Sequence, residues 1–224
     1  MKLLFLGTGG ANWGVEFESR PDFFRRESSA VINNELLIDP GKDVLEALDT
    51  FHVDRKGVKY ILNTHPHEDH LCKETLKALQ TCGAEFIPFK VGETKTFGRY
   101  TVTAYKGNHA AIPTTHFLVS DGEKELYYGL DGAWLMPDAF HTVIDRRVAA
   151  VVLDGTYGFD TFGGIFEHNN MGMIVEMSAV LKQYVGKVYI SHLSSKYHPS
   201  HEVLVKQMSE YGVDVAYDGL ETVL

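Results

Sequence analysis

Three histidines and two acidic residues lie within seven positions, in the segment Thr64-His65-Pro66-His67-Glu68-Asp69-His70. Imidazole nitrogens and carboxylate oxygens bind borderline divalent metal ions. Residues two apart in an extended segment point the same way, so His65 and His67 can offer their rings to one ion. Asp69 and His70 follow at a predicted helix start and can face a second ion, where Asp69 could also align a water nucleophile. The segment therefore predicts a metal site.

Two predicted elements would position this segment. An apolar run from Val58 to Leu62 predicts a strand directly before it. Apolar residues at helical spacing, Cys72, Leu76 and Leu79, predict a helix directly after it. The metal-binding segment is thus expected where a strand ends and a helix begins.

Strands dominate the rest of the chain. Apolar runs of strand length cover residues 2–6, 29–38, 100–105, 117–120, 126–130, 148–153, 187–190 and 213–217. Further helices are predicted through Val44/Leu48/Phe51, Met173/Met177/Leu181/Tyr184 and Leu204/Met208/Tyr211. Two helices in each half, with strands between them, favour a layered α/β sandwich with helices outside two packed sheets. Because no linker or composition break interrupts the chain, we expect one domain over residues 1–224.

Composition excludes several classes of protein. The chain has 224 residues, 21 basic and 30 acidic, and a net charge of −9 with neutral histidines, which disfavours wrapping of polymeric nucleic acid. No stretch approaches the ~18 apolar residues of a membrane span, and the first apolar run is too short for a signal peptide. We therefore expect a cytoplasmic protein without membrane contact. Histidine is unusual, because its 11 copies are roughly twice the average share.

The sequence lacks residues that several other catalytic motifs require. Asn12 stands where a dinucleotide-binding loop needs its third glycine, and Val15 and Glu16 stand where a P-loop needs Lys and Ser or Thr. Cys72 and Cys82 lie on or beside a predicted helix, where structural thiols are expected, and no Gly-x-Ser-x-Gly elbow occurs. Covalent catalysis therefore has no candidate nucleophile.

The His-x-His-x-Asp-His pattern after an apolar strand resembles the metallo-β-lactamase superfamily. Residues 4–10 resemble the first strand and following loop of this superfamily, and residues 37–41 resemble its Ile-Asp turn. The chain is most similar to the phosphoribosyl cyclic phosphodiesterase branch and, more distantly, to ribonuclease Z. The similarity to that branch lies in residues 25–31, 167–170, 190–192 and 216–219. The resemblance extends over nearly the whole chain. It implies an αββα sandwich with a metal site at one edge of its two sheets.

The resemblance implies three further metal ligands. His109 matches the third histidine of the first metal, and His192 matches the last histidine, on the second metal. Asp131 and Asp154 both follow or end apolar strands, so either could bridge the two ions. The family places its bridge after the hairpin that follows His109, which favours Asp131. Asp154 then resembles a carboxylate behind the metals that orients a ligand imidazole.

The resemblance also implies a role for His168, because the matching histidine of the cyclic phosphodiesterase branch assists catalysis from outside the metal shell. Arg26, Ser194 and Lys196 are candidates for contacts with phosphate. The cysteine cluster that holds a structural zinc in that branch is missing, since residues 13–27 contain no cysteine. Those residues predict a long loop whose aromatic side chains could cover the site or form a homodimer contact.

Together these residues predict a hydrolase with two divalent ions, Zn²⁺ or Mn²⁺, with Fe²⁺ also reasonable because no thiolate is among the ligands. A metal-bridging hydroxide would attack a small cyclic or nucleotide-like phosphodiester, and His168 would protonate the leaving alkoxide. One alternative is hydrolysis of a carboxylic ester, thioester or lactam by the same fold. A second alternative is a metal-binding module without catalysis.

Overall fold

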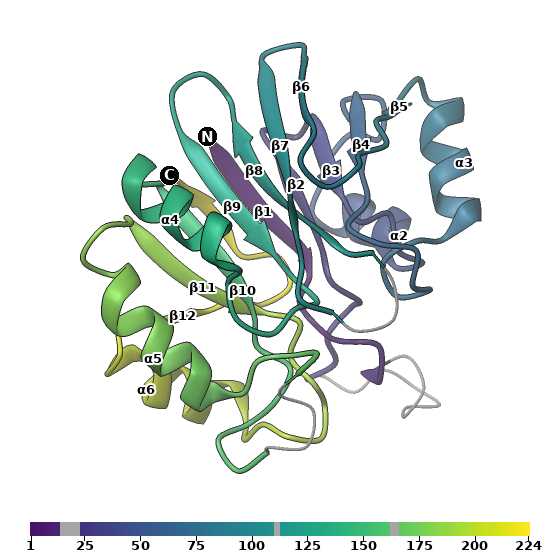
Figure 1. Ribbon diagram of the computed structural model, residues 1–224. Coiled ribbons are helices and arrows are strands. Elements are labelled where there is room, and N and C mark those ends of the chain that lie inside the picture. Colours follow the sequence, from purple (N-terminus) through teal and green to yellow (C-terminus); the bar gives the residue numbers. More distant parts are fainter. Residues whose placement is uncertain (14–22, 110–112, 162–165) are drawn as a thin grey trace. The chain divides into compact units, whose positions relative to one another are not determined.

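The computed structural model describes residues 1–13, 23–109, 113–161 and 166–224 (Figure 1). The chain divides into two compact units, Met1–Phe89 with Ala216–Val223 and Lys90–Val215 with Leu224. Each unit contains one β-sheet of its own. The expectation of a single domain stays a prediction.

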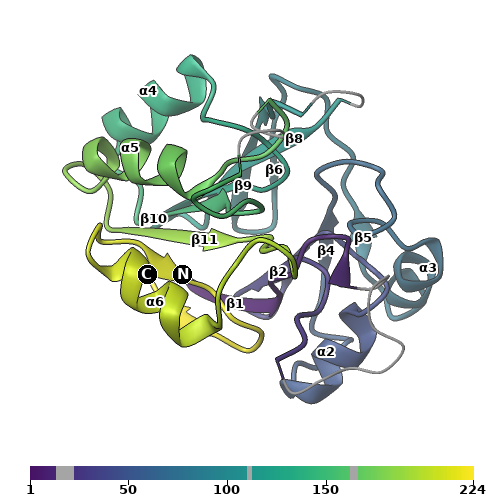
Figure 2. The same ribbon diagram turned by 90° about the horizontal axis from the view of Figure 1, so that it is seen from below.

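The sheet of the first unit has the strand order β13-β1-β2-β3-β4-β5. Its first four strands pair antiparallel, and β3, β4 and β5 pair parallel. Helices α2 and α3 bury apolar residues in one cluster with this sheet (Figure 2). The elements are β1 (Lys2–Gly7), β2 (Ser29–Ile32), β3 (Leu36–Ile38), α2 (Val44–Thr50), β4 (Tyr60–Leu62), α3 (Lys73–Thr81), β5 (Glu85–Phe86) and β13 (Glu221–Val223).

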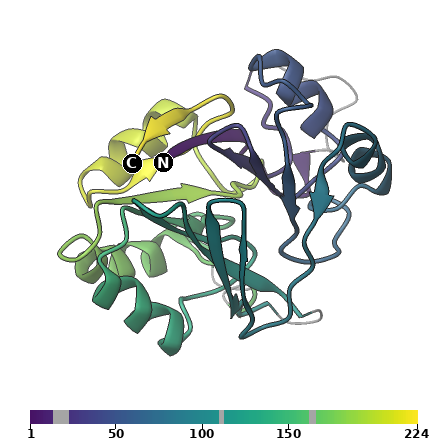
Figure 3. The ribbon, with the colours of Figure 1, turned by 90° about the horizontal axis from the view of Figure 1, so that it is seen from above.

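The sheet of the second unit has the strand order β12-β11-β10-β9-β8-β7-β6. Strands β6 to β9 pair antiparallel and β9 to β12 pair parallel. Helices α4, α5 and α6 share one apolar cluster with this sheet, and α4 lies beside α5 (Figure 3). The elements are β6 (Thr94–Phe97), β7 (Tyr100–Lys106), β8 (Thr115–Ser120), β9 (Glu125–Gly129), α4 (Pro137–Arg146), β10 (Ala150–Asp154), α5 (Met171–Leu181), β11 (Lys187–Ser191), α6 (His201–Ser209) and β12 (Asp214–Val215).

The parallel strands of the second unit decide where polar side chains meet. Because β9, β10 and β11 run in the same direction, their carboxyl ends lie at one edge of the sheet. Asp131 follows β9, Asp154 ends β10 and His192 directly follows β11. The strand order therefore gathers three predicted site residues at that edge.

The predicted strand over residues 29–38 is in fact the hairpin of β2 and β3. Asn33 and Asn34 turn the chain with φ values of 52° and 57°, and Ala30 pairs with Ile38. Asparagine tolerates this left-handed conformation better than other residues with a side chain. The apolar pattern alone did not show this turn.

Four elements were not predicted, namely β5, β6, α4 and β13. Strands β6 and β13 contain no fully buried residue, so their sequences lack the apolar runs used for prediction. Cys72 is the residue before α3 and is only half-buried, so it does not belong to the buried face of that helix. In the described part of the chain, no helix combines the length and apolar character needed to cross a membrane.

The turn between β2 and β3 provides a test of the fold. Replacing Asn34 by valine should lower the free energy of unfolding by about 1–2 kcal/mol, because a β-branched residue is strained at positive φ. Asn34→Gly should stay near the wild-type value, since glycine adopts this conformation readily. Urea unfolding measures both variants. Equal stability of the two variants would contradict the assigned turn.

Candidate metal centre

The first unit places the histidine motif in the loop between β4 and α3. His65, Asp69 and His70 are buried, and His67 is half-buried. The Nε2 atom of His65 lies 2.7 Å from Nδ1 of His67. Two imidazole nitrogens this close either share a proton or bind one ion together. The structure thus brings the first two predicted ligands together.

Asp39 holds this loop from the end of β3. Its fully buried carboxylate accepts hydrogen bonds from the backbone N–H of Thr64 (2.7 Å), the hydroxyl of Thr64 (2.9 Å) and the amide of Asn63 (3.2 Å). It also accepts Nδ1–H of His70 at 2.8 Å. That hydrogen bond leaves Nε2 as the nitrogen of His70 that could bind a metal, and this atom lies 3.3 Å from Oδ2 of Asp69.

The second unit places Asp131, Asp154 and His192 at the carboxyl edge of its sheet, where all three are buried. Oδ1 of Asp131 lies 2.9 Å from Nε2 of His192. Asp154 approaches the opposite side of the same ring, with Oδ2 3.6 Å from Nδ1. The hydroxyl of Thr156 lies 2.8 Å from that Nδ1. This arrangement favours Asp131 as a metal ligand, and it is the hydroxyl of Thr156 that is within hydrogen-bond distance of Nδ1 of His192. The roles of Asp131 and Asp154 stay predictions.

His168 lies in the loop before α5, and its ring stacks on that of His192 with centroids 5.5 Å apart. Its Nδ1 is 2.8 Å from Oδ2 of Asp154. Burial lowers the pKa of His168, but the charge and hydrogen bond of Asp154 outweigh burial and raise it overall. The same contact lowers the pKa of Asp154 despite its burial. His168 is therefore held as the hydrogen-bonded partner of a carboxylate.

His109 follows β7 and lies in the same unit as Asp131, with ligand atoms of the two residues within 4.8 Å. Its ring centroid is 5.1 Å from that of His168, and its Nδ1 is 3.4 Å from the carbonyl oxygen of Glu167. The second unit therefore gathers every site residue predicted within it as a ligand, an orienting carboxylate or a catalytic histidine.

The donor set fits divalent metal ions. In the second unit, ligand atoms of Asp131, Asp154, His168 and His192 all lie within 4.8 Å of one another. Buried carboxylates are costly unless they are paired or bind a metal. The described clusters offer nitrogen and oxygen donors without thiolate, as expected for Zn²⁺, Mn²⁺ or Fe²⁺.

Asn169 joins the loops after β9 and β10, a function that the sequence did not reveal. Its Nδ2 donates to the carbonyl oxygens of Gly132 (3.1 Å) and Asp154 (3.0 Å), and its Oδ1 accepts the backbone N–H of Trp134 at 2.7 Å. The residue is almost completely buried. Although its neighbourhood carries part of the family resemblance, only the folded chain shows what its amide contacts.

His116, expected to be an ordinary structural residue, lies buried in β8. Burial lowers its pKa to about 4, so the ring is neutral near pH 7. A Cβ atom on Gly107 would lie 2.8 Å from the ring, and one on Gly132 would lie 2.9 Å away. These glycines precede His109 and follow Asp131. The ring therefore packs directly between the segments that carry two predicted ligands.

The predicted phosphate contacts differ in their surroundings. The guanidinium of Arg26 lies 2.9 Å from Glu46, 3.7 Å from Asp218 and over the ring of Phe51, so it already has protein partners. Ser194 and Lys196 lie in the loop after β11, where the Ser194 hydroxyl accepts the backbone N–H of Lys196 at 3.2 Å. Their roles stay predictions.

The loop expected over residues 13–27 lies partly outside the described residues, which omit 14–22. Trp13 makes edge-on ring contacts with Phe23 and Phe24. Whether this segment covers the site or a subunit contact stays a prediction.

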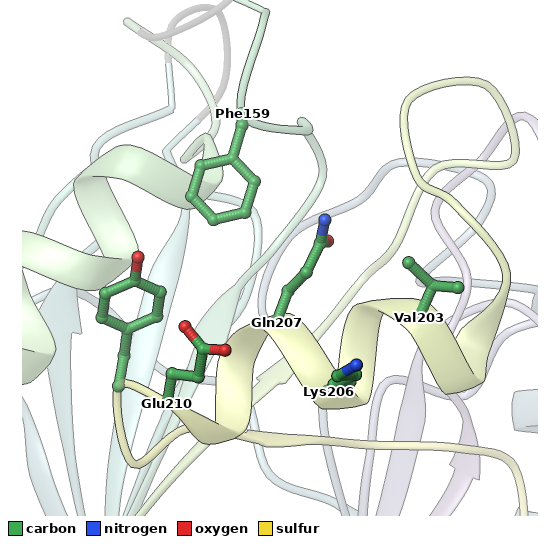
Figure 4. A pocket seen from close by; sticks show the side chains of 6 residues that line it. Phe159, Val203, Lys206, Gln207 and Glu210 are labelled. Carbon is green, nitrogen blue, oxygen red and sulfur yellow. The ribbon is translucent and has the colours of Figure 1, made fainter.

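A hollow of about 490 Å³ on the second unit contains none of the predicted site residues (Figure 4). It lies along α6, and Phe159 extends over it from the loop after β10. Its lining consists of Phe159, Val203, Lys206, Gln207, Glu210 and Tyr211. It is therefore a surface feature separate from the histidine and aspartate clusters.

Comparisons with known proteins identify the fold. The model of the metallo-β-lactamase superfamily matches residues 27–72. No curated protein matches the chain. The metallo-β-lactamase fold protein YhfI from Bacillus subtilis is 18% identical, with a TM-score of 0.76 over 99% of this chain and 98% of that one.

Two other solved structures are similar over the whole of this chain. A diphosphatase from the PhnP family is 16% identical, with a TM-score of 0.76 over 100% of this chain and 97% of that one. Zn²⁺-bound PqqB from Methylobacterium extorquens is also 16% identical, with a TM-score of 0.76 over 100% of both chains. The protein therefore has the α/β metallo-β-lactamase fold, as predicted, with two mixed sheets and, in its described residues, five helices.

The contacts of Asp39 lead to a test of metal binding. Asp39→Asn replaces one acceptor oxygen by a donor, so the side chain can no longer accept from both Thr64 and His70. We expect Zn²⁺ affinity to fall about 10- to 100-fold, measured by competition with a chromophoric chelator.

The control is Asp49→Asn, which alters an exposed carboxylate paired with Arg55. Thermal unfolding of both metal-free variants separates a loss of affinity from a loss of folding. Wild-type affinity in a folded Asp39→Asn protein would show that Asp39 does not orient a ligand.

Proposed function

We propose that the protein is a metal-dependent phosphodiesterase that hydrolyses a small cyclic or nucleotide-like phosphodiester. The observation that carries this proposal is the Asp154–His168 pair at the carboxyl edge of the second sheet, beside Asp131 and His192. A histidine whose proton is held by a carboxylate can serve as a general acid. Such an acid is needed most when the leaving group is an alkoxide, as in a nucleotide ester.

The family resemblance implies how the ligands are divided between two ions. His65, His67 and His109 would bind the first ion, His70 and His192 with Asp69 would bind the second, and Asp131 would be shared. When bound, the ions would activate a water molecule and neutralise charge on the phosphate oxygens.

The side chains of this chain have separate tasks in the proposed reaction. Asp69 accepts a hydrogen bond from the attacking water and directs its lone pair at phosphorus. Asp154 keeps a proton on Nδ1 of His168. When the ring is protonated, Nε2–H donates to the leaving alkoxide oxygen as the P–O bond breaks.

Two observations separate this proposal from its alternatives. The PhnP-family neighbour is described as a diphosphatase, a name that denotes activity on phosphate groups. Hydrolysis of a thioester has no equal need for an acid at the position of His168, because a thiolate leaves without a proton. A metal-binding module without catalysis would not require the Asp154–His168 pair.

We propose that the enzyme acts in the cytoplasm.

Phosphodiesterase activity tests the proposal. The protein loaded with Zn²⁺ or Mn²⁺ should hydrolyse bis-p-nitrophenyl phosphate, and chelation should abolish turnover until metal is restored. His65→Ala should reduce kcat/KM at least about 100-fold, because a metal ligand is removed. The control His141→Ala changes an exposed histidine on α4 and should keep wild-type turnover. No hydrolysis, or equal hydrolysis by His65→Ala, would contradict the proposal.

The role of His168 can be tested with leaving groups of different basicity. His168→Gln should slow cleavage of an ester with an alkoxide leaving group by about 10²- to 10⁴-fold. It should slow release of p-nitrophenolate much less, because that leaving group needs no proton. Stopped assays on paired substrates measure the two ratios. Equal losses on both substrates would exclude His168 as the general acid.

A further inference from the structure

Exposed aromatic side chains gather in the loops that follow the parallel strands of the second unit. Trp134 follows β9, Phe159 and Phe166 follow β10, and Tyr197 follows β11. They are 39%, 37%, 79% and 44% exposed. Among the described residues of this unit, the other large aromatic exposed to this extent is Tyr184, beyond the end of α5. Gathered exposed apolar side chains commonly mark a binding site.

A continuous series of rings connects these loops with the proposed acid. The ring of Tyr157 meets that of His168 edge-on, with centroids 5.7 Å apart. Tyr197 meets Tyr157 in the same manner at 5.1 Å. Tyr157 is half-buried and Tyr197 is exposed. The series therefore leads from the proposed catalytic histidine to an accessible aromatic ring.

The loops that carry these rings are fastened to the strand ends. Nε2 of His198 donates to the carbonyl oxygens of Gly155 (2.8 Å) and Thr156 (3.0 Å). The backbone of Tyr197 also packs so closely on Gly158 that a Cβ there would lie 2.0 Å from the Tyr197 carbonyl oxygen. These contacts fix the backbone at residues 197–198 relative to residues 155–158, which include Tyr157.

Trp134 is held in a strained backbone conformation. Its φ is 58°, in the left-handed region that bulky residues rarely adopt. Its backbone N–H donates to Asn169, the same residue that binds the carbonyl oxygen of Asp154. Such strain is characteristic of functional positions. The backbone of Trp134 is thus held by the same residue that binds the carbonyl oxygen of Asp154.

We infer that Tyr197, with Tyr157 beside it, forms a subsite that stacks the aromatic base of a nucleotide substrate. The inference rests on the proposed function and names the substrate class of that site. A nucleobase stacks on aromatic side chains without needing a specific hydrogen-bond pattern. In a nucleotide, a single sugar separates the base from the phosphate. In the protein, a single ring, that of Tyr157, separates His168 from Tyr197.

The test compares two substrates that share the reacting group. One is adenosine 2′,3′-cyclic phosphate and the other is 1-O-methylribose 2,3-cyclic phosphate, which lacks the base. Tyr197→Ala should raise KM for the nucleotide about 10-fold with little change in kcat, and should leave the base-free substrate unaffected. Tyr197→Phe should keep the wild-type KM. Tyr184→Ala is the matched control, an exposed aromatic residue elsewhere, and should change neither substrate.

Two kinetic results would overturn the inference: no preference of the wild type for the nucleotide, or equal effects of Tyr197→Ala on both substrates. Equilibrium dialysis with adenosine monophosphate and ribose 5-phosphate tests the subsite without turnover. If the protein cleaves neither cyclic phosphate but Tyr197→Ala still weakens adenosine monophosphate alone, the proposed function fails and the base subsite stands. If Tyr197→Ala leaves adenosine monophosphate binding unchanged, the subsite is wrong whatever the activity.

Discussion

In each unit a buried aspartate at a strand end lies 2.8 Å from Nδ1 of a histidine, Asp39 with His70 and Asp154 with His168. A hydrogen bond of this kind fixes the tautomer and the angle of the imidazole, so that Nε2 is available for chemistry. Without it, a buried ring could rotate and bind a proton at either nitrogen. The orientation of these two histidine rings in the candidate site therefore depends on two carboxylates that need not contact a metal themselves.

Three candidate site residues have a backbone conformation that is unfavourable for residues with a side chain. Asp39, Asp131 and His192 each follow a strand and have φ values of 61°, 53° and 60°. A left-handed conformation costs each such residue about 1–2 kcal/mol. The chain tolerates this cost because each position follows a strand buried in a sheet, which determines where the chain must turn.

Much of this arrangement could be predicted from the sequence, because apolar runs locate the buried strands and the residues at their ends. The motif of residues 65–70, Asp154 at the end of β10 and His192 after β11 were found in this way. The contacts of Asn169 and the packing of His116 could not be predicted, since they depend on which loops meet in space. Strand β6 was missed because its side chains are largely solvent-exposed. The turn at Asn33 was missed because the apolar residues on both sides of the polar segment 33–35 were assigned to a single strand.

The central proposal is that the buried aspartates and histidines of the candidate site bind two divalent metal ions. Elemental analysis of protein purified without chelator, with the dialysed protein titrated by Zn²⁺ and by Mn²⁺, tests it most directly. The account predicts about two tightly bound ions per chain, and a loss of tight binding at both positions in Asp131→Asn, whose carboxylate would be shared. One ion or fewer per wild-type chain, or two ions retained by Asp131→Asn, would contradict it.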